Sequence, residues 1–330
     1  MKLSIITVSY NTKDLTLQTL ETAIKEINSS KLLKGQTEIF VVDNDSKDGS
    51  PAACETLLKK LKFPHYKVFA NKDNLGFARA NNQATEVAKG EYIILLNSDT
   101  ITHPGGLSLL VEAMDAHPVR EATANSSDSQ EFDKLGMIAP TLLNPDGSIQ
   151  NQGGDLPSLL SVAAQMLFLD DIPVLGRLLP STQHTGMSEK AFHNYDQNTP
   201  ALISKGWIAG TAMLMRRALI DDIGLLDGNI FMYGEDQEYC MRARHHHWDI
   251  AIHPRATITH FGCASSSSRN AIHGEIKGYL YIWHKHMPAW QLPLLKGILW
   301  LGASLRQLAY SLRRQEVPAV IYKDARTLLK

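Results

Sequence analysis

The first hundred residues alternate between short apolar runs and longer segments in which apolar positions recur every three or four residues. The segment after the first run shows this helical spacing at Leu17, Leu20 and Ile24. Strands that alternate with helices imply right-handed crossovers and a mainly parallel sheet. The pattern therefore predicts an α/β fold, in which ligands bind beyond the carboxyl ends of the strands. The predicted strands are residues 3–10, 38–44, 66–71 and 92–97.

Polar residues stand at the ends of three of these strands. Any one group could be a turn or a helix cap, because Asn, Asp and Ser favour both. Three groups on one edge, two of them with acids, favour a ligand site instead. An acid directly after a buried strand is well placed to hold a divalent cation against a diphosphate, because Mg²⁺ and Mn²⁺ prefer carboxylate and phosphate oxygens. The three groups are Ser9-Tyr10-Asn11, Asp43-Asn44-Asp45 and Asn97-Ser98-Asp99.

The pattern is less regular after residue 103. Residues 105–117 predict a helix, 125–133 a polar surface loop, and 136–150 a strand, a turn and a returning strand. Residues 151–200 show no clear periodicity. A strand followed by a helix is predicted over 206–227.

Two acids open a further predicted helix. Glu235 and Asp236 follow Gly234, and acids in a first helical turn are favoured by the helix dipole. They could therefore serve only as stabilising residues at the helix start. An acid raised beside a substrate cleft could instead act as a general base, and these residues alone leave both readings open.

The histidines near this helix receive different interpretations. Residues 248–260 predict two short strands that end at His260, and a lone histidine is more often structural than a ligand. Consecutive side chains on a helix diverge by about 100°. The three histidines at 245–247 are therefore interpreted as a solvated helix end and not as a metal site.

Composition narrows the class of protein. The 330 residues include 33 basic and 34 acidic side chains, which argues against a nucleic-acid partner. The three cysteines are far apart in sequence and predict a reducing compartment without a disulfide framework. The amino terminus becomes polar too soon for a secretory signal, and no apolar run reaches 18 residues. We therefore expect a cytoplasmic protein.

Seven short motifs follow one another along the chain. They are VSYN (8–11), VVDNDSKDGS (41–50), NLGFARANN (74–82), LLNSDT (95–100), GWIAGTAMLMRR (206–217), FMYGEDQEYCMRAR (231–244) and HFG (260–262). Each motif alone is modest, but the set in this order resembles the family 2 glycosyltransferases, and especially their rhamnosyltransferase-like bacterial branch. The resemblance implies a GT-A catalytic domain over 1–285, with a nucleotide-binding half at 1–103 and an acceptor half at 104–285. Residues 286–330 remain as a C-terminal amphipathic helical region.

The resemblance also implies roles for the strand ends. Asp99 stands at the metal-binding position, with His260 as a further ligand of Mg²⁺ or Mn²⁺. Asn97 replaces the first acid of the family's Asp-x-Asp motif, which leaves less negative charge beside the metal. The residues implied to hold the nucleotide are Ser9, Tyr10, Asn11, Asp43, Asp45, Arg79, Asn82, Asn97 and Ser98.

The implied reaction is a single displacement with inversion. Asp236 matches the catalytic base, with Glu235 as its neighbour and rival, while Trp207 and Gly210 line the acceptor side. The branch favours dTDP-L-rhamnose as donor, with a UDP-sugar second. The acceptor would be a saccharide or a lipid-linked saccharide in cell-surface polysaccharide synthesis. A catalytically inactive sugar-nucleotide-binding scaffold stays open as an alternative because of Asn97.

Two further segments carry hypotheses. Residues 287–314 combine tryptophans and leucines with Lys and Arg, which is typical of an interfacial helix on an anionic membrane. We expect it to contact the inner face of the cytoplasmic membrane, and packing on protein is the alternative. Residues 264–270 are small and polar and predict a lid over the diphosphate, with Arg269 adding positive charge. A connector without that role is the alternative.

Overall fold

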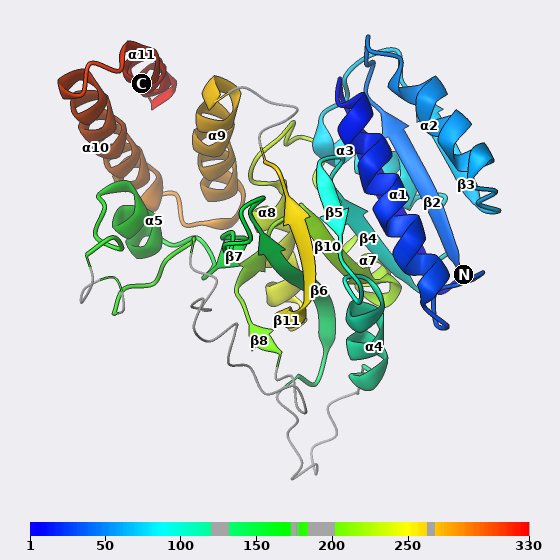
Figure 1. Ribbon diagram of the computed structural model, residues 1–330. Helices are drawn as coiled ribbons and strands as arrows, with labels where there is room; N and C mark the ends of the chain where they lie inside the picture. The colour runs from blue at the N-terminus through cyan, green and yellow to red at the C-terminus, as the bar shows by residue number, and fades with distance from the viewer. Residues whose placement is uncertain (120–131, 173–175, 177, 184–201, 263–267, 330) are drawn as a thin grey trace, which may run out of the picture.

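The computed structural model contains a central nine-stranded sheet with helices on both faces (Figure 1). Three C-terminal helices gather beside it, at the upper left of Figure 1: α9 (Ser268–His286), α10 (Gln291–Leu312) and α11 (Glu316–Ala325). The chain ends in a short 3₁₀ helix, Arg326–Leu329. The structure describes residues 1–119, 132–172, 176, 178–183, 202–262 and 268–329. Most of the surface loop expected at 125–133 lies outside these ranges.

The amino-terminal half follows the predicted alternation. Four strands pair in parallel in the order β3-β2-β1-β4, so their carboxyl ends meet at one edge of the sheet. The third helix ends at Thr85. The elements are β1 (Leu3–Ser9), α1 (Lys13–Ser29), β2 (Thr37–Asp43), α2 (Ser50–Lys60), β3 (Tyr66–Ala70), α3 (Phe77–Thr85) and β4 (Tyr92–Leu96).

The second half extends the sheet with mixed pairing. Strand β10 runs antiparallel to both β4 and β6, while β11 lies parallel to β6 and antiparallel to β5 and β8. Strands β7 and β9 form a small separate sheet. The elements are β5 (Thr100–Thr102), α4 (Ser108–Ala116), β6 (Leu135–Leu143), β7 (Gly153–Gly154), α5 (Leu159–Met166), β8 (Ile203–Ser204), β9 (Trp207–Ile208), β10 (Ala212–Arg216), α7 (Arg217–Ile223), α8 (Glu235–His245) and β11 (Asp249–His260).

Strand β11 corrects one expectation. The two short strands predicted over 248–260 are one strand of 12 residues, interrupted by a shift of register between His253 and Thr257. The His253 ring closes this irregularity, because its Nδ1 accepts the backbone N–H groups of Arg255 and Ala256 at 3.2 and 3.1 Å. The strand therefore continues past the proline at 254, and its end stays fixed to β5.

The core explains why the sheet residues are so uniformly apolar. Alternate residues of each central strand face opposite layers, as Ile5 packs with α1 and α2 while Ile6 packs with α3. A third apolar cluster joins α5 to α9, α10 and α11, with Trp283 and Leu295 buried in it. Among the described residues, none of the helices is long and apolar enough to cross a membrane.

Candidate active site

A cavity of about 990 Å³ opens beyond the carboxyl ends of β1 and β4. One side is formed by these strand ends, and the opposite side by the loop 229–234, the start of α8 and one face of α9. The fold thus brings together residues separated by more than 250 positions in the sequence. Nine of the predicted site residues line the cavity: Tyr10, Asn97, Ser98, Asp99, Trp207, Gly210, Glu235, Asp236 and His260.

Strand pairing places Asp99 beside His260. Asp99 immediately precedes β5, and Thr100 of β5 pairs with His260 of β11. The backbone N–H of Phe261 donates to the carbonyl oxygen of Asp99 at 3.0 Å, which fixes the two chain segments together. As a result, Asp99 Oδ1 lies 3.3 Å from His260 Nε2 at the cavity wall.

The glutamine Gln150 orients the His260 ring. Its amide nitrogen donates to Asn144 Oδ1 at 2.9 Å, so its Oε1 is the acceptor 2.7 Å from His260 Nδ1. Nδ1 therefore donates to Gln150, and Nε2 is the ring nitrogen that faces Asp99. A metal-binding histidine donates its other ring N–H in the same way. Nothing in the sequence around Gln150 pointed to this role.

The donor atoms at this point fit a divalent cation that also binds phosphate. Asp99 offers a carboxylate oxygen and His260 an imidazole nitrogen, both of them mostly buried. The described part of the chain contains no group of three His, Cys, Asp or Glu side chains that could enclose a metal. Mg²⁺ bound with substrate phosphates usually takes only one or two protein carboxylates. Asp99 and His260 therefore suit an ion that a diphosphate helps to coordinate.

The loops after β1 and β2 are tied to each other beside the cavity. Asn11, with a φ of 53°, donates its N–H to Ser46 Oγ at 2.8 Å and accepts the Lys47 N–H at its Oδ1 at 2.7 Å. Asp43 accepts the N–H of Ser46 with Oδ2 at 2.9 Å, while its buried Oδ1 has no partner among the described residues. Asp45 forms an ion pair with Lys47. Asp43 thus keeps one acceptor available at a strand end.

Ser9 contributes to the floor beneath these loops. Its buried hydroxyl contacts the hydroxyls of Thr12 and Thr16 at 3.4 and 3.1 Å. Thr12 in turn lies 3.0 Å from the hydroxyl of Ser98, which faces the cavity. Ser9 therefore connects to the site through Thr12 and does not line it.

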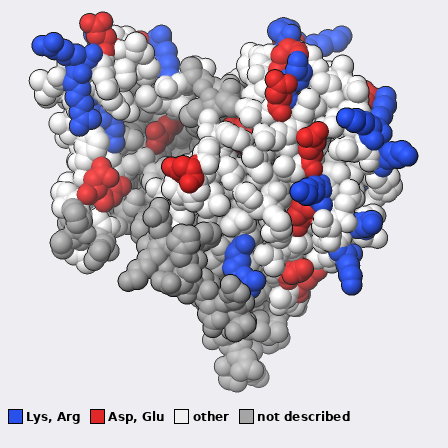
Figure 2. All heavy atoms as spheres, viewed as in Figure 1, with Lys and Arg blue, Asp and Glu red and all other residues white. Residues whose placement is uncertain are grey.

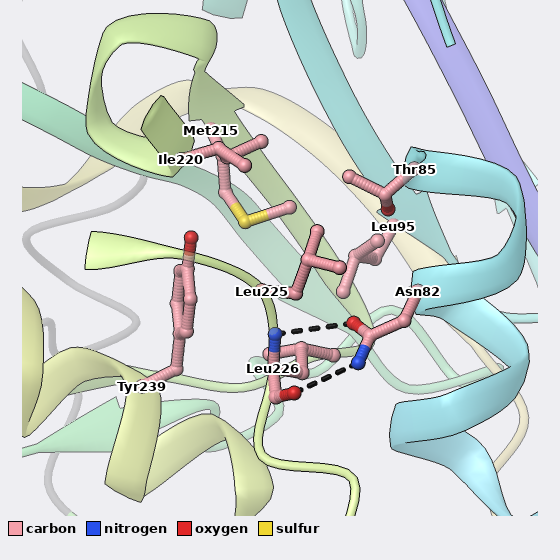
Figure 3. Close-up of a pocket in the computed structure, with 8 residues that line it drawn as sticks. All are labelled: Asn82, Thr85, Leu95, Met215, Ile220, Leu225, Leu226 and Tyr239. Carbon is pink, nitrogen blue, oxygen red and sulfur yellow. Dashed lines mark hydrogen bonds between the residues drawn. The ribbon is translucent and has the colours of Figure 1, made fainter. Parts of the chain in front are cut away.

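Arg79 and Asn82 also lie outside the cavity. Asn82 exchanges two hydrogen bonds with the backbone of Leu226, at 2.8 and 3.1 Å, in a small pocket behind α3 (Figure 3). Arg79 Nε donates to the carbonyl oxygen of Gly228 at 2.6 Å. Both side chains hold the segment that leads into the loop 229–234. The structure thus does not bring them to the strand ends.

Asp236 stands at the start of α8 with two backbone donors. Its Oδ2 accepts the N–H of Gly210 at 3.1 Å, and its Oδ1 accepts the N–H of Gln237 at 2.8 Å. Gly210 has little room for a side chain, since an added methyl group would lie 3.1 Å from the ring of Phe77. Trp207, nearby on β9, donates its indole N–H to the carbonyl oxygen of Thr182 at 2.8 Å. Asp236 and the two predicted acceptor-side residues therefore share one part of the cavity wall.

The two adjacent acids both have raised pKa values, but their surroundings differ. Burial and, after it, the charge of Asp236 raise the pKa of Glu235 to about 8. Burial also raises the pKa of Asp236, but its hydrogen bonds from Gly210 and Gln237 oppose that effect. The two backbone donors therefore favour the ionised form of Asp236, whereas burial and the neighbouring Asp236 favour the protonated form of Glu235. Of the two, Asp236 is the better suited to act as a general base.

Helix α9 forms a wall that sequence reasoning missed. Tyr233 and Gly234, directly before α8, have φ angles of 71° and 103°. A methyl group at Gly274 would lie 2.5 Å from the Tyr233 ring, and one at Gly278 would lie 2.5 Å from the Tyr233 carbonyl oxygen. Two glycines one helical turn apart thus let α9 touch the loop that positions Asp236. The Gly-x-x-x-Gly spacing was the signal available in the sequence.

The lid was predicted over residues 264–270. Most of this segment lies outside the described ranges, which leave out 263–267. Arg269 is described, and its guanidinium forms an ion pair with Asp324 of α11 at 2.8 Å.

Comparison with known proteins finds similarity to glycosyltransferases. Residues 4–137 match the model of the family described as "Glycosyl transferase family 2". The N-acetylglucosaminyl-diphospho-decaprenol L-rhamnosyltransferase of Mycobacterium tuberculosis is 25% identical over 293 residues, which are 84% of this chain and 85% of that protein. The UDP-Glc:alpha-D-GlcNAc-diphosphoundecaprenol beta-1,3-glucosyltransferase WfaP of Escherichia coli is 27% identical over 136 residues, 41% of this chain and 50% of that protein.

Solved structures agree on the fold. The mannosyltransferase PcManGT of Pyrobaculum calidifontis, in complex with GDP-Man and Mn²⁺, aligns with a TM-score of 0.56 at 14% identity, over 99% of this chain and 83% of its own. GalNAc-T7 with UDP, GalNAc and Mn²⁺ aligns with a TM-score of 0.60 at 14% identity, over 90% of this chain and 51% of its own. The predicted α/β architecture is confirmed. The chain therefore has the GT-A fold of these glycosyltransferases, and its residues 4–137 are similar to glycosyl transferase family 2.

Proposed function

We propose that this protein is an inverting, metal-dependent glycosyltransferase that transfers a sugar from a nucleoside diphosphate to a lipid-linked saccharide. One observation carries the proposal: the similarity to the mycobacterial L-rhamnosyltransferase extends over 84% of this chain and 85% of that enzyme. The similarity thus includes both the donor half and the acceptor half, whereas the family model covers only residues 4–137.

The acceptor is better supported than the donor. The names of both relatives specify a GlcNAc-diphospho-polyprenol acceptor, but one enzyme transfers rhamnose and the other glucose. We therefore propose a lipid-linked saccharide with a diphosphate as acceptor. We propose dTDP-L-rhamnose as donor because the rhamnosyltransferase matches over the longer range, with a UDP-sugar as the second candidate.

The reaction is a displacement at the anomeric carbon. Asp236 takes the proton of an acceptor hydroxyl, whose oxygen then attacks the anomeric carbon from the face opposite the diphosphate. The bond from that carbon to the diphosphate oxygen breaks, and the nucleoside diphosphate leaves with both bonding electrons. Asp99 and His260 would hold Mg²⁺ or Mn²⁺, which as a Lewis acid stabilises the charge of the leaving group. These roles require the base and the metal ligands to face the same cavity. Asp236, Asp99 and His260 all line it.

The remaining predicted residues receive roles consistent with their positions. Trp207 and Gly210, beside Asp236, would contact the acceptor. Ser9, Arg79 and Asn82 would act through the loops that they hold. The residues proposed to contact the nucleotide directly are Tyr10, Asn11, Asp43, Asp45, Asn97 and Ser98.

The proposal includes a cellular setting. A lipid-linked acceptor has to be met at a membrane surface, so we propose that the protein is cytoplasmic and works as a peripheral protein on the inner face of the cytoplasmic membrane. Nucleic acid is not among the partners that we propose.

Nucleotide release tests the proposal. The purified chain with Mg²⁺ or Mn²⁺ is mixed with dTDP-L-rhamnose, UDP-glucose, UDP-galactose or UDP-GlcNAc, and free nucleoside diphosphate is measured with and without a short-chain GlcNAc-diphospho-prenol. We expect slow metal-dependent release from dTDP-L-rhamnose, faster release with the acceptor, and loss of release in Asp99→Ala. If release occurs only from a UDP-sugar, that sugar nucleotide would take the place of dTDP-L-rhamnose as the proposed donor. No release from any donor, with no thermal stabilisation by dTDP or UDP, would favour the inactive scaffold.

A further inference from the structure

We propose that one exposed face of α10 is a docking surface for an anionic lipid bilayer. The proposal rests on the proposed function, because a lipid-linked acceptor would be met at a membrane. Its evidence comes from the C-terminal helices. The surface is defined as the α10 stripe, six apolar side chains: Trp290, Leu294, Leu301, Leu305, Leu308 and Leu312.

The α10 stripe is continuous along the helix. At 100° per residue, its six positions fall within about 60° of one another around the helix axis. Their relative exposures range from 38% to 76%. Gly297 lies about 20° outside this sector and has no neighbouring atom within 4 Å of an added methyl group. No charged side chain lies within this sector of α10, which spans 22 residues and thus about 33 Å.

Folding of the helix uses its other face. Leu295 and Leu299 are fully buried in the cluster with α5 and α9. Gly302 packs so closely that an added methyl group would lie 2.8 Å from Met166 Cβ. The α10 stripe therefore remains apolar and exposed after the intramolecular packing is complete. Exposed apolar patches of this kind mark interaction surfaces.

The exposure is concentrated in this part of the molecule. Of 19 large apolar side chains that are exposed among the described residues, nine lie between Trp290 and Val320. They include Val317 and Val320 of α11 as well as the α10 stripe. A patch of this extent is more than the single exposed leucines that any soluble surface carries.

Charge indicates what the α10 stripe meets. Residues 286–330 carry seven basic and two acidic side chains, whereas residues 1–285 carry 26 basic and 32 acidic ones. Arg313 and Arg314, at the end of the stripe, are exposed. Blue side chains accordingly gather over α10 and α11 at the upper left of Figure 2. A basic unit with an apolar stripe fits an interface of anionic lipid headgroups and acyl chains.

The structure also corrects which residues of 287–314 could meet lipid. Arg306 donates to the carbonyl oxygens of Gln165 and Met166, at 2.9 and 2.5 Å, and so serves folding. Trp300 lies on another side of α10, with the Arg326 guanidinium 5.7 Å from its ring centre. The proposed surface therefore includes Trp290 but neither of these residues.

Helix α9 lies between α10 and the catalytic cavity. Helix α9 packs against α10 in the third apolar cluster, and other residues of α9 line the cavity (Figure 1). The proposed membrane surface and the site where a lipid-linked acceptor would react thus belong to neighbouring elements of the fold.

Vesicle co-sedimentation of the full chain tests this surface. We expect binding to phosphatidylglycerol-containing vesicles and much weaker binding to phosphatidylcholine alone. The double variant Leu301→Glu/Leu308→Glu should lower binding at least tenfold, while Val87→Glu, at an exposed apolar site on another element, should bind as the wild type does. Arg313→Gln/Arg314→Gln should lower binding about fivefold per charge and reduce its dependence on salt.

Three results would overturn the proposal. The first is a wild-type chain that does not bind anionic vesicles, and the second is a double variant that binds them like the wild type. The third is a wild-type chain that is a dimer without lipid while the double variant is a monomer, which would assign the stripe to a second copy. Thermal stabilisation by nucleotide confirms that each variant is folded. Nucleotide release in water needs no membrane. Intact release without vesicle binding therefore rejects only the docking surface, and vesicle binding without release rejects only the proposed reaction.

Discussion

The two walls of the cavity are built in different ways. The donor wall consists of strand ends and the loops after them: Tyr10 follows β1, Asn97 to Asp99 follow β4, and His260 ends β11. The acceptor wall consists of the loop 229–234, the start of α8 and one face of α9. Its shape depends on backbone contacts between Gly278 of α9 and Tyr233 of the loop.

The two walls carry different groups of functional residues. The donor wall carries Asp99 and His260, whose positions are fixed by the pairing of β5 with β11. The acceptor wall carries Asp236, whose position is fixed by Gly210 and by the helix packed on the preceding loop. We therefore expect changes in the donor wall to act on nucleotide and metal affinity, and changes in the acceptor wall to act on the rate of transfer.

The largest expected effect is that of Asp236→Asn on the acceptor wall. The amide oxygen can still accept the Gly210 N–H, while the amide nitrogen gives up the hydrogen bond from the Gln237 N–H. Loss of the general base should lower kcat by about 10²–10⁴-fold with little change in donor affinity. Transfer assays measure the first quantity, and thermal shifts with the donor nucleotide measure the second. A variant that loses nucleotide binding instead would contradict the division between the walls.

Gln150→Ala tests the donor wall with the next largest effect. Without the Oε1 acceptor 2.7 Å from Nδ1, the His260 ring loses the partner that fixes its tautomer. Removal of such a partner usually weakens metal affinity by about 10–100-fold. The metal concentration for half-maximal nucleotide release should rise accordingly, while kcat at saturating metal stays near that of the wild type. An unchanged metal requirement would mean that His260 acts without Gln150, or is not a ligand.

How far the sequence predicted the molecule follows the same division. The four parallel strands of the donor half were visible as apolar runs, and the polar residues after them line the cavity at Tyr10 and Asn97 to Asp99. Those features depend on neighbours in sequence. The role of Gln150, and the diversion of Asn82 to Leu226, depend on contacts between residues more than 100 positions apart. Apolar periodicity carries no information about such contacts.

The acceptor wall was harder to predict for a related reason. Glycine has a low helix propensity, so a glycine in a helical segment weakens the prediction of a helix. Gly274 and Gly278 have their significance only because a second segment, with Tyr233 at positive φ, lies directly against them. Residues 151–200, which gave no clear pattern, contribute Gln183 and the carbonyl oxygen that holds Trp207. Their positions could not be derived from local sequence.

Gly278→Ala measures how tightly α9 controls the acceptor wall. The added methyl group would lie 2.5 Å from the Tyr233 carbonyl oxygen, so helix and loop must separate. We expect about 1–3 kcal/mol of destabilisation and a severalfold lower kcat, without a change in nucleotide affinity. Gly297→Ala in α10 is the matched control, because nothing lies within 4 Å of its added methyl group. Alanine there should leave activity intact and raise helix stability by up to about 1 kcal/mol. Equal effects of the two variants in urea unfolding and transfer assays would show that α9 does not control the loop.

The smallest expected effect on the rate, that of Glu235→Gln, decides between the two acids of the acceptor wall. If Glu235 holds a proton at neutral pH, the neutral amide should replace it with less than about a threefold change in kcat, since proton transfer to a base contributes far more. If Glu235 were the base instead, this variant would lose activity as Asp236→Asn is expected to do. The transfer rate of the two variants at pH 7.5 separates these cases.

The pH dependence of stability gives the same variant a second readout. Glu235 has a pKa of about 8 in the folded chain, against an ordinary 4.5. Between these values the folded state binds the proton that the unfolded state has released, so the free energy of unfolding falls as pH rises from about 4.5 to 8. The glutamine of Glu235→Gln does not titrate in either state. The free energy of unfolding of the variant, measured by urea titration at pH 5, 6.5 and 8, should therefore fall less than that of the wild type. A parallel fall in variant and wild type would mean that Glu235 is already ionised in the folded chain, and the argument for Asp236 as the charged acid would then rest on its two backbone donors alone.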